Sequence, residues 1–118
     1  MKTSVLLLAL ALAACTETLA PNKTGFGAQY QVAAEPPPSV SGSSLIVTLQ
    51  YGGCNGGHDF QLITRMHDLD AEVWLKKRTP DQTCDMLIIE DRAFELAFPV
   101  SVAQHLTLFA PNGNFTLR

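Results

Sequence analysis

Hydrophobic and polar residues alternate with a period of two through most of the chain beyond residue 44. In the first of these segments Leu45, Val47, Leu49 and Tyr51 share one face. The alternation recurs in five later segments, at 60–66, 71–77, 92–98, 105–109 and 115–117, and a run rich in apolar residues lies at 84–91. Because successive side chains of a strand point to opposite faces, the pattern predicts seven or eight short β-strands.

Turn-forming residues separate these segments. The clearest example is Asn112 and Gly113, which fit a tight hairpin between the last two segments. No segment keeps a helical period over three turns, so the predicted fold class is all-β. Uneven strand lengths favour an antiparallel, immunoglobulin-like β-sandwich over a closed barrel. The apolar run at 84–91 favours a central position for that strand within its sheet.

One short helical turn is predicted between strands, at 79–82. The sequence there is Thr-Pro-Asp-Gln, with threonine at the N-cap, proline at the first position and glutamine at the third. This is a capping-box pattern for a single turn. The preceding cationic residues, Lys76, Lys77 and Arg78, are interpreted as a solvated strand end.

The first 14 residues have the pattern of a bacterial signal peptide. Lys2 precedes a short apolar run, and small residues stand before Cys15. The sequence Leu-Ala-Ala-Cys at 12–15 resembles the lipobox of bacterial lipoproteins, which implies that Cys15 is lipidated and becomes the mature N-terminus. The alternative is an ordinary secretory signal in which Cys15 is incidental. Thr16 in place of aspartate favours sorting to the outer membrane, facing the periplasm.

Removing the signal peptide leaves enough chain for one domain. Residues 15–43 are predicted to be a tether, with a possible edge strand at 25–32 and a proline- and serine-rich linker from 35. The β-sandwich domain is expected to span 44–118. The partners implied are the membrane, through the N-terminal lipid, and an envelope protein.

Residues 15–118 carry seven basic and eleven acidic side chains. Nothing in the sequence forms a basic stripe, so nucleic acid is not an expected partner. If Cys15 carries lipid, Cys54 and Cys84 remain as an even pair in an oxidising compartment. A disulfide between them would stabilise the fold by about 3–4 kcal/mol. Two free thiols or two metal ligands are weaker alternatives, because neither cysteine lies in a Cys-x-x-Cys pair.

The candidate binding surface is built around that predicted disulfide. It would order two polar segments, the glycine-rich run and the turn before Cys84, and bring Asn55, His58 and Asp81 together on an exposed surface. Ordered polar loops on a rigid scaffold are common sites of partner binding.

Two His-Asp dipeptides, at 58–59 and 67–68, raise the possibility of a metal site. On a strand, however, adjacent residues point to opposite faces, so one dipeptide cannot supply two ligands to one site. We therefore predict no catalytic residue, no metal and no cofactor.

The motif Gly-Gly-Cys-x-x-x-His-x-Phe at 52–60, followed by Asp-x-x-Cys-Asp at 81–85, resembles a group of small bacterial lipoproteins. The resemblance covers 51–98, and the group has no assigned activity. The sequence thus favours a non-catalytic, lipid-anchored envelope protein with a binding or structural role. The alternative is a periplasmic inhibitor of a lytic enzyme or protease, and a metalloenzyme comes third.

Overall fold

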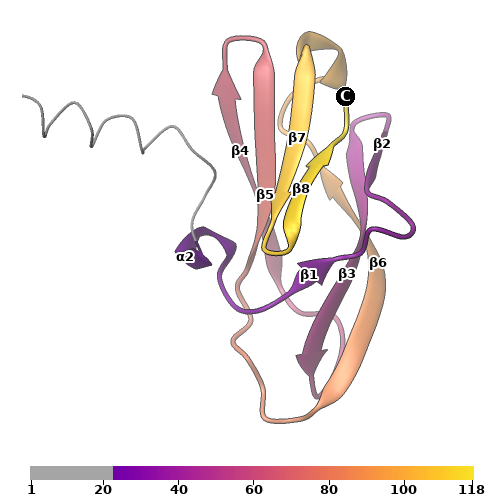
Figure 1. Cartoon of the computed structure of the whole chain (residues 1–118), viewed down its shortest axis with the longest axis vertical. Coiled ribbons are helices and arrows are strands. Elements are labelled where there is room, and N and C mark those ends of the chain that lie inside the picture. The colour runs from indigo at the N-terminus through magenta and orange to yellow at the C-terminus, as the bar shows by residue number, and fades with distance from the viewer. Residues whose placement is uncertain (1–22) are drawn as a thin grey trace, which may run out of the picture.

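The computed structural model describes residues 23–118, so the predicted signal peptide and Cys15 lie outside the described residues. Eight strands form two sheets that pack face to face (Figure 1), which confirms the predicted β-sandwich. The first sheet holds β1 (Gln31–Val32), β2 (Ser39–Ser41), β3 (Ser44–Gly53) and β6 (Met86–Glu95). The second sheet holds β4 (Phe60–His67), β5 (Asp70–Lys77), β7 (His105–Ala110) and β8 (Gly113–Thr116).

Two short helical elements complete the described chain, α2 (Lys23–Phe26) and the 3₁₀ turn η1 (Val100–Val102). Gly27 ends α2 with a φ of +75°. A side chain at this position would collide with the backbone of Lys77, because its Cβ would lie 2.3 Å from the Lys77 carbonyl oxygen. Within residues 23–118 neither helix has the length and apolarity needed to cross a membrane.

The core lies between the two sheets and is built from the alternating positions that the sequence predicts. Its largest fully buried aliphatic side chains are Val32, Leu45, Val47, Leu49, Val73, Leu75, Leu106 and Leu108. Burial of each such side chain contributes about 1.5–3 kcal/mol. Most of the stability of the sandwich therefore comes from strands β3, β5 and β7.

Strand pairing departs from an all-antiparallel arrangement at one place. The second sheet has the order β4-β5-β7-β8, and its pair β5–β7 is parallel. After β5 the chain crosses to the first sheet as β6 and returns through η1, so β7 runs in the same direction as β5. The predicted hairpin at the end of the chain is present as β7–β8, with Gly113 at a φ of +143°.

The position of β6 differs from the sequence-based prediction. The apolar run at 84–91 was expected in the centre of a sheet, and 92–98 was expected to be a separate strand. Instead one uninterrupted strand, Met86–Glu95, pairs with β3 on one side only and forms an edge of the first sheet. The lower halves of β3 and β6 also extend past the second sheet (Figure 1).

The folded unit begins before Ser44, where the sequence placed the domain boundary. The segments expected as tether and linker contain β1 and β2, and both pair with β3. Tyr30 and Val32 are buried in the core. The side-chain amide of Asn112, from the β7–β8 turn, donates to Val32 O at 2.8 Å and accepts from Val32 N–H at 3.0 Å. These contacts fix β1, which is only two residues long, in addition to its pairing with β3.

Candidate functional site

A disulfide between Cys54 and Cys84 closes the projecting end of the β3–β6 pair, as predicted. Cys54 directly follows the last residue of β3, and Cys84 stands two residues before the first residue of β6. The two Cα atoms are 4.9 Å apart. The bond thus covalently joins two strand ends that the second sheet does not cover.

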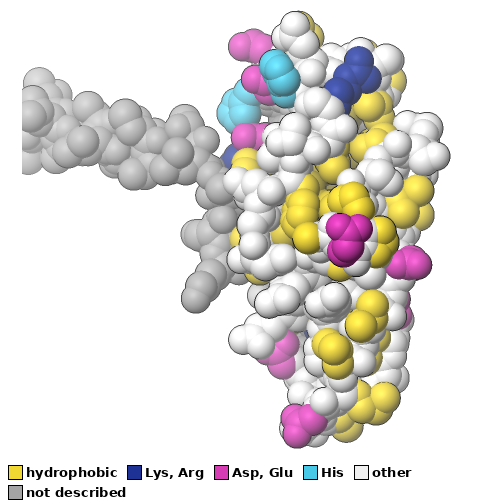
Figure 2. Space-filling view, turned by 45° about the vertical axis from the view of Figure 1, so that its right-hand side comes forward, with side chains coloured by type: hydrophobic (Ala, Val, Ile, Leu, Met, Phe, Trp, Pro, Cys, Tyr) yellow, Lys and Arg dark blue, Asp and Glu magenta, His cyan; other side chains and the backbone are white. Residues whose placement is uncertain are grey.

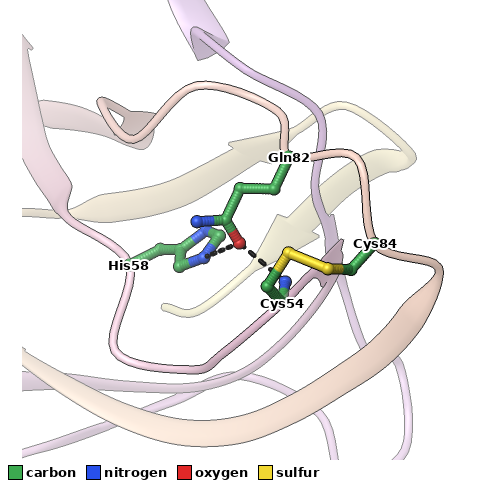
Figure 3. The surroundings of a disulfide bond; sticks show 4 residues. All are labelled: Cys54, His58, Gln82 and Cys84. Carbon is green, nitrogen blue, oxygen red and sulfur yellow. Dashed lines mark hydrogen bonds between the residues drawn. A yellow bond between two sulfur atoms is a disulfide. The ribbon is translucent and has the colours of Figure 1, made fainter.

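Gln82 connects the disulfide to the glycine-rich loop. Its side-chain carbonyl oxygen accepts a hydrogen bond from Cys54 N–H at 2.7 Å and lies 3.1 Å from His58 Nε2 (Figure 3). Because a backbone N–H can only donate, the atom facing Cys54 is the oxygen of the amide. His58 Nε2 therefore carries the proton and donates to the same oxygen.

The predicted helical turn at 79–82 does not form. Those residues have no helical structure, and their capping side chains bond to other segments. Thr79 Oγ1 accepts from Asp59 N–H at 2.7 Å, and Gln82 is committed to Cys54 and His58. Contacts across the loop therefore replace the local contacts of a capping box.

Two glycines of the loop lie close to side chains of neighbouring segments, which would have to move to accept a Cβ. A Cβ at Gly53 would lie 2.8 Å from Gln82 Oε1 and 2.9 Å from His58 Cε1. A Cβ at Gly56 would lie 2.8 Å from Glu90 Oε2. The loop has few side chains because polar groups of neighbouring segments occupy the space beside its backbone.

Behind the loop, Tyr51 of β3 and Glu90 of β6 form a polar cluster on the inner face of their sheet. The Tyr51 hydroxyl donates to Glu90 Oε1, and Glu90 Oε2 accepts from Gly57 N–H at 3.0 Å. Arg92 Nη1 donates to Glu90 Oε1 and to His58 O, each at 3.0 Å. His58 N–H donates to the Tyr51 hydroxyl at 3.3 Å, and the two rings lie 4.5 Å apart. The cluster fixes the C-terminal end of the loop through the backbone groups of Gly57 and His58.

Burial and hydrogen bonding shift two pKa values in this cluster. Burial alone would raise the pKa of Glu90, but hydrogen bonds from Tyr51, Gly57 and Arg92 outweigh it and hold the pKa below its usual value. Burial, together with the hydrogen bond to Glu90, raises the pKa of Tyr51. At neutral pH the pair is therefore a carboxylate and a neutral phenol.

Lys77 is another charged residue that the fold buries. The sequence suggested a solvated strand end, yet this side chain is almost completely buried. Its Nζ donates to Thr79 O at 2.8 Å and lies 5.2 Å from the centre of the Tyr51 ring. Desolvation lowers the pKa of Lys77, and the nearby negative charge of Asp81 offsets part of that effect.

The structure leaves two of the three predicted binding residues exposed and buries the third. Asn55 is exposed, and so is Asp81, which accepts from Gln29 N–H at 3.2 Å. His58, however, is only 3% exposed and is held between Gln82 and Tyr51. The expectation that His58 lies on the binding surface is therefore wrong, because the ring is part of the scaffold beneath that surface.

The sequence pattern did not identify Gln82, Tyr51, Glu90 and Arg92 as parts of this site. The sequence did contain a signal for Glu90 and Arg92. They occupy alternate positions of β6 with Ile88 before them and Phe94 after them, on the face that turns inward. Two opposite charges at apolar-facing positions indicate a paired, partly buried cluster. No comparable signal marks Gln82, whose partners are distant in sequence.

An open groove of about 680 Å³ lies between the segment 26–31, the end of β3 and the β7–β8 turn. Among the described residues that line it, none carries a charge at neutral pH. The part of the chain that the structure describes holds no cluster of three or more potential metal ligands.

Comparisons of the chain with protein-family models, curated proteins and solved structures found no match. The geometry of the described residues and the N-terminal sequence pattern therefore carry the functional assignment.

Proposed function

We propose that this protein is a non-catalytic, lipid-anchored protein of the bacterial cell envelope whose β-sandwich binds a partner. The observation that carries the proposal is the Cys54–Cys84 disulfide. Such bonds form and persist in oxidising compartments such as the periplasm. This agrees with the signal-peptide pattern at 1–14 and the lipobox that ends at Cys15.

A binding role, as opposed to catalysis, is supported by how the polar groups near the disulfide are used. The two carboxylate oxygens of Glu90 accept from Tyr51, Arg92 and Gly57. The Nε2 proton of His58 is committed to Gln82. These hydrogen bonds join the side chains to one another and to backbone segments, as expected of a scaffold, although His58 Nδ1 is buried without a partner among the described residues.

Cell fractionation tests the proposal. The wild-type protein is expected in the membrane fraction, and density-gradient separation is expected to place it in the outer membrane. Cys15→Ser should move it to the soluble fraction. Asn55→Ala is the matched control and should stay with the membrane. A wild-type protein found entirely in the soluble fraction would contradict the proposal.

A second candidate function is inhibition of a periplasmic lytic enzyme or protease. It is favoured by the loop Cys54 to Gly57, whose four residues are all exposed and whose first residue is fixed by the disulfide. A rigid exposed loop of this kind can enter an active-site cleft with little loss of conformational entropy. Inhibition assays against lysozymes and proteases, repeated with Asn55→Arg, distinguish this candidate from a general binding role. Inhibition that the substitution abolishes would favour it.

A further inference from the structure

The outer edge of β6 presents a row of unpaired backbone groups. Leu96 N–H donates to Ser43 O at 2.8 Å, and this pair continues the β3–β6 register. Along an antiparallel strand, alternate residues direct their N–H and C=O groups to opposite sides. Even-numbered residues of β6 therefore face β3. The residues that direct their backbone groups to the open side are Leu87, Ile89, Asp91, Ala93 and Glu95.

This edge has only part of the usual protection. Within residues 23–118, no backbone hydrogen bond is made to the open side of β6. Proteins normally shield such edges with charged side chains, proline or a β-bulge. Met86–Glu95 has charged side chains, including the inward-facing Glu90 and Arg92, but it contains neither proline nor lysine, and its ten register pairs with β3 run without a bulge. An edge of this length without proline or a bulge can pair with another strand.

The first half of the edge is also apolar and exposed. Met86, Leu87 and Ile89 are 59%, 68% and 58% exposed. Figure 2 shows the side of the molecule that carries the first sheet, with hydrophobic side chains at the surface of its lower half and acidic ones close by. A large exposed aliphatic side chain gains free energy when a partner covers it, at about 25 cal/mol per Å² of apolar area.

The second half of the edge is acidic. Asp91 and Glu95 are exposed, and hydroxyl groups of the first sheet hold them in place. Thr48 Oγ1 donates to Asp91 Oδ1 at 2.6 Å, and Ser43 Oγ donates to Glu95 Oε1 at 2.6 Å. Their charges are therefore displayed in fixed positions beside the open backbone groups.

A second copy of this chain fits the edge poorly. Antiparallel pairing centred on Asp91 would place two Asp91 side chains opposite each other. Pairing centred on Ile88, in the apolar half, would place Asp91 opposite Asp85 of the other copy. Like charges directly opposite each other destabilise strand pairs. Pairing centred on Ile89 avoids like charges but places each Asp91 opposite Leu87, because the open side of β6 carries no basic residue. The charge pattern favours a different strand, with positive charges in place of these aspartates.

We propose that the open edge of β6 binds, as an added antiparallel strand, an extended segment of a partner protein. That segment carries apolar residues opposite Leu87 and Ile89 and basic residues opposite Asp91 and Glu95. This inference rests on the proposed binding function and identifies its surface and the chemistry of its partner. The Cys54–Cys84 disulfide holds the first residues of β6 in place before the partner arrives, which reduces the entropy lost on binding.

Amide hydrogen exchange of the mature protein in detergent micelles tests the inference. The probe is a nine-residue peptide with lysines opposite Glu95 and Asp91, valines opposite Ile89 and Leu87, and threonines elsewhere. At a peptide concentration of about ten times its Kd, exchange at the amides of 87, 89, 91, 93 and 95 should slow by about tenfold. A peptide with glutamates in place of the lysines should give no protection.

Two variants make the test specific. Ile89→Lys should abolish the protection, since it places a positive charge opposite the peptide's valine and close to the peptide's own lysines. Leu69→Lys is the control, because Leu69 is similarly exposed, at 54%, but lies in the turn between β4 and β5. Its response to the peptide should equal that of the wild type.

Four results would overturn the inference. They are no protection by the lysine peptide, equal protection by the glutamate peptide, protection confined to residues outside β6, and a dimer that Ile89→Lys dissociates. Fractionation of Cys15→Ser tests lipid anchoring alone. A negative peptide result would therefore disprove strand addition at β6 without disproving the proposed anchoring.

Discussion

The ring of His58 donates a hydrogen bond, through Nε2, to the side-chain oxygen of Gln82 at 3.1 Å. The same oxygen accepts from Cys54 N–H. One acceptor thus links the start of the glycine-rich loop, its end and the segment before Cys84. The disulfide ties two of these segments together, and Gln82 sets their geometry.

Gln82→Ala is expected to lower the free energy of unfolding by about 1–3 kcal/mol, because it removes the acceptor for two N–H donors. Gln82→Glu keeps an acceptor at this position and should cost less. Urea unfolding followed by circular dichroism measures both. Asn55→Ala, at an exposed position in the same loop, is the control and should change stability by less than about 0.5 kcal/mol. Equal effects of Gln82→Ala and the control would rule out this role for Gln82.

His58→Ala is expected to destabilise the fold by about 2–3 kcal/mol, since it leaves a cavity against Tyr51 and removes a donor to Gln82. The effect on partner binding should be small, because the ring is buried. Thermal unfolding and peptide titration measured on the same sample separate the two quantities. Full stability combined with lost binding would place His58 back on the binding surface.

Replacing both cysteines, Cys54→Ser with Cys84→Ser, is expected to cost about 3–4 kcal/mol. The closed loop spans 30 residues, and its closure restricts the unfolded chain. Chemical unfolding of the oxidised protein and the double variant gives the difference. A loss below about 1 kcal/mol would mean that the polar cluster alone orders the end of β3–β6.

Stability should fall in acid because of Glu90. Its folded-state pKa lies below its ordinary value of 4.5, so its stabilising effect is complete well above that pH. The effect is lost as the pH falls from there through the folded-state pKa, since the unfolded chain then binds the proton more readily. Tm measured between pH 7 and pH 3 should drop less steeply for Glu90→Gln than for the wild type. Identical slopes would assign the acid sensitivity to other carboxylates.

Local pattern was enough to predict most of the strands of this fold. The alternation in 45–51 corresponds to β3, and Asn112 with Gly113 corresponds to the β7–β8 turn. The pairing of Cys54 with Cys84 followed from the count of cysteines in an oxidising compartment. These features depend on neighbouring residues or on composition, both of which a single sequence displays.

Features set by distant contacts could not be predicted in the same way. Of the capping-box residues, Thr79 bonds to Asp59, 20 residues earlier, and Gln82 bonds to Cys54 and His58, 28 and 24 residues earlier. The run at 84–91 is apolar enough for a central strand, yet no strand lies on its outer side in the described chain. Apolar content indicates that a surface needs cover, and it does not say whether the chain itself provides that cover.

The central claim is a lipid-anchored protein with a disulfide-closed sandwich, and mass spectrometry of protein extracted from its own membrane tests it most directly. The account predicts a mature chain that begins at Cys15 with an acylated N-terminus, and an unreduced digest that contains Cys54 linked to Cys84. A chain that begins at another residue without lipid, or one in which Cys54 and Cys84 are free thiols, would contradict it.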